Sequence, residues 1–200
     1  MKLFKRLLAV ALAGMMALTV LTGCSSVNEK EFVAILNDAL KTPLVASKVE
    51  KIGIKEFKAA DSDVNHKTAA VADIVRNAEV KEGEGIDDVL KAKKADIQNV
   101  LVGGENDTNV YFVSYATKVT YGSKLFQTFD DGLDVVEVIT HMGDNTFAGK
   151  AVADREVKDA TVLVGFTDVN VNGKTYTLVV MKAPTVEWTP EDGGNIDIGG

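Results

Sequence analysis

The sequence contains few of the side chains from which thiol, metal and nucleophilic sites are built. It has one cysteine, Cys24, and two histidines, His66 and His141, among 200 residues. A single thiol excludes an intramolecular disulfide and a paired redox motif, and two imidazoles exclude a three-histidine zinc site. Neither a Gly-x-Ser-x-Gly nucleophile motif nor a complete phosphate-binding glycine-rich loop occurs in the chain. We therefore expect no cofactor, and catalysis is not the first expectation.

Basic side chains are also in the minority. The chain has 22 lysines and arginines against 29 aspartates and glutamates, which gives a formal net charge of −7 at pH 7. Three of the basic residues lie ahead of Cys24, so 19 remain from Cys24 onward against all 29 acidic residues. Nucleic-acid binding needs clustered lysine and arginine, so no nucleic-acid partner is expected. An anionic membrane surface should repel this acidic part of the chain as a whole.

The first 24 residues contain the parts of a secretory signal in the correct order. Lys2, Lys5 and Arg6 supply the positive charge, residues 7–21 form an apolar stretch, and small residues precede Cys24. The apolar stretch is shorter than the roughly 20 residues that a membrane-spanning helix needs. Its last residues, Leu21-Thr22-Gly23-Cys24, resemble the lipobox of bacterial lipoprotein precursors.

The lipobox resemblance implies a lipid anchor. Residues 1–23 would be a signal peptide that is removed, and Cys24 would become the mature N-terminus with a thioether-linked diacylglycerol. Two acyl chains hold a protein firmly, whereas one chain binds only marginally. The expected partner is therefore membrane lipid through Cys24, at the extracytoplasmic face of the cell membrane. Residues 24–28 would be the anchor residue and a short tether.

Helical patterns dominate the chain directly after this tether. A capping pair at Asn28 and Glu31 precedes apolar residues at helical spacing, and Pro43 ends or restarts that helix. Two further helices are predicted over 64–78 and 86–94.

From about Asp96 the composition becomes typical of strands joined by turns. Asn172-Gly173 favours a two-residue hairpin turn between strands over 161–171 and 174–183. Further strands are expected over 110–121 and 125–129, whereas residues 133–142 fit a helix and a strand equally well. We predict a single α+β domain over 29–190, with N-terminal helices and then a mainly antiparallel sheet, and a flexible tail over 191–200.

Two segments partly match a calcium-binding loop. Asp168, Asn170, Asn172 and Gly173 follow the first half of the D-x-N-x-N-G pattern, but Val179 stands where the bidentate glutamate belongs. The same residues form a good hairpin turn, so they are only weak candidates for a metal site. Asp61, Asp63 and Asn65 repeat part of the pattern, and a helix N-cap explains them better.

Tyrosines and acidic residues give the remaining candidates for a ligand site. In a strand, Tyr111, Val113 and Tyr115 share one face, which could pack in the core or serve as a platform for a sugar or peptide. Acidic pairs such as Glu105 with Asp107 are abundant, but their separation across a cleft is not readable from the sequence.

A series of short motifs runs along the chain in a fixed order: Leu36-Asn37, Pro43-Leu44, an alanine-rich segment over 69–78, Gly104-Glu105-Asn106, Val164-Gly165-Phe166 and Asn172-Gly173-Lys174-Thr175-Tyr176. These motifs resemble those of the CAP (SCP-like) superfamily of secreted proteins. The resemblance implies an α/β/α sandwich as the alternative fold, with Glu105 in the cavity of that family. The cavity histidines are not evident, and Lys150 follows Gly149 where the later one would fall.

The sequence therefore predicts a membrane-anchored extracytoplasmic lipoprotein, with a non-enzymatic binding or interaction module of the cell envelope. An envelope protein or a glycan is its expected class of partner. The alternative is a divergent CAP-like or hydrolytic domain that acts on envelope or extracellular substrates through Glu105, His66 or His141.

Overall fold

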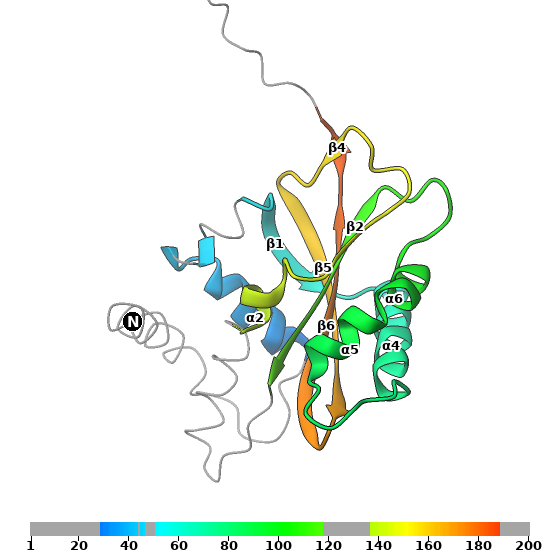
Figure 1. The fold of residues 1–200 in the computed structure, drawn as a ribbon. Coiled ribbons are helices and arrows are strands. Elements are labelled where there is room, and N and C mark those ends of the chain that lie inside the picture. Colours follow the sequence, from blue (N-terminus) through cyan, green and yellow to red (C-terminus); the bar gives the residue numbers. More distant parts are fainter. Residues whose placement is uncertain (1–28, 44, 47–50, 118–136, 189–200) are drawn as a thin grey trace, which may run out of the picture.

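The computed structural model describes residues 29–43, 45–46, 51–117 and 137–188 (Figure 1). A five-stranded sheet lies at its centre, in the order β1-β5-β6-β2-β3. Its strands are β1 (Ile54–Ala59), β2 (Asn109–Thr117), β3 (Thr146–Ala148), β5 (Ala160–Val171) and β6 (Lys174–Pro184). β1 pairs in parallel with β5, and the other neighbours are antiparallel. This confirms the predicted α+β fold with a mainly antiparallel sheet.

Helices cover the sheet on both sides (Figure 1). They are α2 (Glu29–Ala39), α4 (Ser62–Arg76), α5 (Ile86–Ala92) and α6 (Lys94–Leu101). α2 lies on one side, whereas α4, α5 and α6 lie on the other. A two-stranded ribbon of β4 (Arg155–Glu156) and β7 (Val186–Glu187) extends from one end of the sheet. Within the described residues, no helix has the length and apolar character needed to cross a membrane.

The sheet separates two hydrophobic cores because its strands alternate their side chains between the two faces. The α2 core packs under α2 and is built of these buried residues: Phe32, Leu36, Ala39, Val45, Ile54, Phe57, Phe112, Ala116, Val138, Ile139, Met142, Ala160, Val162, Val164, Val179, Met181 and Ala183. The three-helix core packs under α4, α5 and α6 and is built of these: Val71, Ala72, Val75, Ile86, Val89, Leu90, Ile97, Leu101, Tyr111, Val113, Tyr115, Phe147, Val169, Val171, Tyr176, Leu178 and Val180.

The central hairpin forms as its turn residues predict. Asn172 and Gly173 both have positive φ, 49° and 77°, as the two central residues of a type I′ turn require. β5 and β6 pair directly on either side of this turn, from Val171 opposite Lys174 onward.

One predicted boundary is wrong, and one strand was not predicted. Strands do not begin near Asp96, because Lys94–Leu101 forms α6 and the next strand begins at Asn109. Ile97, Val100 and Leu101 have helical spacing, and Ile97 and Leu101 are fully buried. β1 was not predicted, so the described helices do not all precede the sheet. A register shift between Ile54 and Glu56 interrupts the alternation that would mark β1 as a strand.

The segment over 133–142 is described from residue 137 onward, and residues 137–141 are helical. The predicted strand over 125–129 and the predicted tail over 191–200 lie outside the described residues.

A polar side chain joins α2 to the outer edge of the sheet. The Asn37 side-chain amide donates to the carbonyl of Phe57 at 2.8 Å, and its oxygen accepts from the Phe57 N–H at 2.8 Å. Phe57 lies on β1, which is an edge strand among the described strands of the sheet, so its outer backbone groups have no described strand beside them. Asn37 therefore satisfies the backbone of the edge strand and fixes the position of α2.

Candidate functional site

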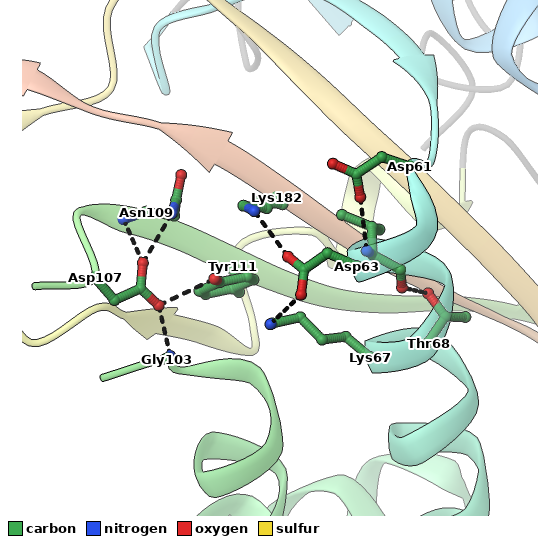
Figure 2. Close-up of polar contacts among 10 residues, drawn as sticks. Asp61, Asp63, Lys67, Thr68, Gly103, Asp107, Asn109, Tyr111 and Lys182 are labelled. Carbon is green, nitrogen blue, oxygen red and sulfur yellow. Dashed lines mark hydrogen bonds and ion pairs between the residues drawn. The ribbon is translucent and has the colours of Figure 1, made fainter. Parts of the chain in front are cut away.

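Tyr111 and Asp107 form the centre of one polar network, where the loop after α6 meets β2 (Figure 2). The Tyr111 hydroxyl donates to Asp107 Oδ2 at 3.0 Å. The same carboxylate accepts from the backbone N–H of Gly103 and from the backbone and side-chain N–H groups of Asn109, at 2.6 to 2.9 Å. Four donors therefore surround the Asp107 carboxylate, and these hydrogen bonds connect the loop after α6 to β2.

A second carboxylate lies beside this group, at the start of α4. Asp63 lies between two lysines: Lys67 Nζ is 2.7 Å from Oδ1, and Lys182 Nζ is 2.8 Å from Oδ2 (Figure 2). Lys67 Nζ also lies 5.7 Å from the centre of the Tyr111 ring, a cation–π contact that links the two carboxylate groups. Asp61 caps the same helix by accepting from the Val64 N–H at 2.8 Å.

These interactions fix the protonation states of the network. Hydrogen bonds from Lys182 and Lys67 lower the pKa of Asp63. Burial alone would raise the pKa of Asp107, but the hydrogen bonds it accepts outweigh burial and lower that pKa. Burial and the Asp107 carboxylate raise the pKa of Tyr111 well above its ordinary value. At neutral pH the carboxylates are therefore ionised and the tyrosine is protonated, so none of them is ready to exchange a proton.

Tyr115 forms a second cluster further along the same strand. Its hydroxyl donates to Asp87 Oδ2 at 2.7 Å, its ring stacks on His141 with centroids 4.6 Å apart, and it meets Tyr176 edge to face at 5.8 Å. His141 Nδ1 lies 2.9 Å from Asp144 Oδ2. Burial and Asp87 raise the pKa of Tyr115, so this hydroxyl is also protonated at neutral pH.

The two tyrosines are buried side chains of the three-helix core. Tyr111 is 2% exposed and Tyr115 is 5% exposed. Together with Val113 they lie on one face of β2, while Phe112, Ser114 and Ala116 lie on the other, as the strand pattern predicted. Rings buried in this way pack against their neighbours and present no open face for a sugar or a peptide to stack on.

Glu105, His66 and His141 have separate surroundings. Glu105 is exposed and pairs with Lys150 Nζ at 2.6 Å; His66 is exposed on α4; and His141 contacts Tyr115 and Asp144. Within the described part of the chain, no hydrogen bond or ion pair joins any two of these three residues. In the described residues, these three side chains are therefore not joined in one hydrogen-bonded set.

The residues of the partial calcium motif form hydrogen bonds in and around the turn between β5 and β6. Asn170 Oδ1 accepts from the Gly173 N–H at 3.1 Å, and the Asn172 side-chain amide donates to the carbonyls of Lys81 and Glu84, both at 2.8 Å. Asp168 Oδ1 accepts from the Thr177 hydroxyl at 3.4 Å. Among the described residues, no group of three histidine, aspartate or glutamate side chains is arranged to hold a metal ion.

Sequence reasoning missed Asp87 and Lys182, and it treated Asp107 only as one of an acidic pair. Asp63 and Lys67 stand four apart on a helix, a spacing that favours an ion pair and that could have indicated this contact. Lys182 reaches the same carboxylate from 119 positions away in the sequence, and no local pattern signals such a contact.

No protein-family model, no curated protein and no solved structure matches this chain.

Proposed function

We propose that this chain is a lipoprotein anchored to the extracytoplasmic face of a cell membrane, and that its folded part is a non-enzymatic binding or interaction module of the cell envelope. One observation carries the proposal: Leu21-Thr22-Gly23-Cys24 ends a positively charged and apolar leader. In this arrangement Cys24 is the lipidation site, and its diacylglycerol attaches the protein to the bilayer.

The polar groups of the two tyrosine clusters support the non-enzymatic part of the proposal. A general acid or base needs a pKa near the working pH. The pKa values of Tyr111 and Tyr115 are raised above their ordinary value, and those of Asp63 and Asp107 are lowered. Within the described residues, every buried side-chain nitrogen or oxygen has a hydrogen-bond partner. These groups therefore stabilise contacts between elements of the fold, and we expect a partner to bind at the surface.

The anchor is tested by replacing Cys24 with serine in the full-length precursor and expressing it in a bacterium that lipidates its lipoproteins. Wild-type protein should incorporate labelled fatty acid and enter the detergent phase of a Triton X-114 separation. The Cys24→Ser protein should incorporate no label and should either leave the membrane fraction or accumulate unprocessed. Ser26→Ala is the matched control and should behave as wild type. Equal labelling and processing of Cys24→Ser and wild type would contradict the anchor.

The non-enzymatic part needs a separate test with purified, acylated protein. Peptidoglycan, ester and peptide substrates should remain unhydrolysed. Hydrolysis that is lost in Glu105→Gln, His66→Ala or His141→Ala would instead establish the hydrolytic alternative.

A further inference from the structure

The acidic charge of the chain is unevenly distributed. The described residues between 29 and 60, which contain α2 and β1, have five lysines and four acidic residues. Residues 61–117, which contain α4, α5, α6 and β2, have six basic and 11 acidic residues. The net charge is thus about neutral on the α2 and β1 side and strongly negative on the helices across the sheet (Figure 1).

Exposed lysines lie along the α2 and β1 side. Lys30 on α2, Lys51 before β1 and Lys55 on β1 are exposed, and none of the three has an ion-pair partner among the described residues. Lys41 and Lys58, also exposed, pair with Asp38 and Glu56. A hydrogen bond from Lys58 and, more weakly, the charge of Lys55 lower the pKa of Glu56. This side therefore offers exposed lysines that no ion pair within the described residues neutralises.

The length of the tether restricts which side of the domain can face a bilayer. Cys24 is five residues before Glu29, the first residue of α2. Five residues span at most about 18 Å in any conformation, whereas a compact domain of this size is roughly 40 Å across. If Cys24 is in the membrane, the start of α2 stays within about 18 Å of it, which favours an orientation with the α2 side toward the bilayer.

We propose that the side formed by α2 and the β1 edge lies against an anionic lipid surface, with Lys30, Lys51 and Lys55 toward the headgroups and the three-helix side away from the membrane. This inference rests on the proposed lipid anchor and specifies the orientation that the anchor imposes. Lysine at an anionic surface is attracted and acidic residues are repelled, so the charge distribution and the tether favour the same orientation. The acidic net charge that repels the chain as a whole then acts mainly on the far side.

The orientation can be measured because an acylated Cys24 leaves no free thiol in the mature protein. Lys55→Cys places the sole free thiol on β1, and Glu187→Cys places it on the β4 and β7 ribbon, where the Glu187 side chain is 86% exposed. Each acylated variant is labelled with a fluorophore and reconstituted in vesicles of phosphatidylcholine and phosphatidylglycerol that carry a quencher on the lipid headgroup. The label at position 55 should be quenched and the label at 187 should remain bright. Equal quenching at both positions overturns the proposal.

Charge reversal separates the contribution of the lysines from that of the tether. Lys30→Glu, Lys51→Glu and Lys55→Glu, combined in a Glu187→Cys background, should allow the ribbon to approach the anionic surface and increase quenching there. Lys81→Glu, Lys91→Glu and Lys94→Glu change the charge equally on the three-helix side, and this control should leave the ribbon label bright. Unchanged quenching in both triple variants overturns the role of the lysines.

Detergent partition of every variant is recorded in parallel. A wild-type chain that is not acylated refutes the proposed anchor, whereas acylated chains with equal quenching refute only the orientation. Circular dichroism at increasing temperature identifies any variant that fails to fold.

Discussion

The α2 core and the three-helix core lie back to back on one sheet, yet their aromatic residues differ. The α2 core contains Phe32, Phe57 and Phe112. In the three-helix core, every buried aromatic residue except Phe147 is a tyrosine. Two of these tyrosines donate to carboxylates at the edge of the helical layer, Tyr111 to Asp107 and Tyr115 to Asp87.

The difference between the aromatic residues of the two cores reflects how many helices each side of the sheet positions. On one side, α2 is a single helix beside the edge strand, and Asn37 supplies its directional contact. On the other side there are three helices, and hydroxyl-to-carboxylate bonds fix the start of α5 and the loop that follows α6. Apolar burial is nearly non-directional. The layer of α4, α5 and α6 has more helices to position, and it therefore uses more hydrogen bonds.

Truncating the apolar core should have the largest effect on stability, and it should be similar on the two sides. Leu36 in the α2 core and Leu90 in the three-helix core are both fully buried. Leu36→Ala and Leu90→Ala should each lower the free energy of unfolding by about 2–5 kcal/mol, because each removes apolar burial and leaves a cavity. Chemical denaturation measures both. A loss below about 1 kcal/mol at either position would show that this core is not closely packed there.

Asn37→Ala should have a smaller effect, limited to the α2 side. It leaves the N–H and carbonyl of Phe57 without their side-chain partner, which costs about 1–3 kcal/mol. Faster hydrogen exchange at the Phe57 amide should accompany the loss, because α2 no longer protects it. Asn99→Ala, on the exposed side of α6, is the control and should change stability little. If Asn37→Ala matches this control, Asn37 does not fix α2.

The smallest single-site effects at neutral pH are expected from Tyr111→Phe and from Tyr115→Phe, since each replacement removes one hydrogen bond of about 1–2 kcal/mol, and a double variant combines the two. The pH dependence is more diagnostic. The folded state raises the pKa of both tyrosines, so their contribution is complete below about pH 10 and is lost at higher pH, where the unfolded chain releases these protons first. The free energy of unfolding should therefore fall less steeply above pH 10 in the double variant. Parallel curves would contradict the hydroxyl contacts.

Local signals predicted much of the fold. Asn172-Gly173 determined the central hairpin, and the alternation along residues 111–116 gave the correct faces of β2. Asp61 was correctly interpreted as a cap of α4, because capping depends on neighbours within one turn. In each case the controlling interactions join residues that are close in the sequence.

Long-range contacts account for what sequence reasoning did not predict. β1 is held by pairing with β5 about 105 residues later and by Asn37 of α2. The charged network likewise depends on Lys182 meeting Asp63 across the fold. Burial of Tyr111 and Tyr115 follows from the helices that cover them, which the strand pattern does not specify.

Mass spectrometry of the N-terminal peptide from membrane-extracted protein is the most direct test of the lipid anchor. If Cys24 is the anchor, the peptide begins at Cys24 and has the added mass of a diacylglycerol on its sulfur. A peptide that begins at another residue, or a Cys24 with a free thiol, would contradict the lipid anchor and with it the orientation of the domain on the membrane.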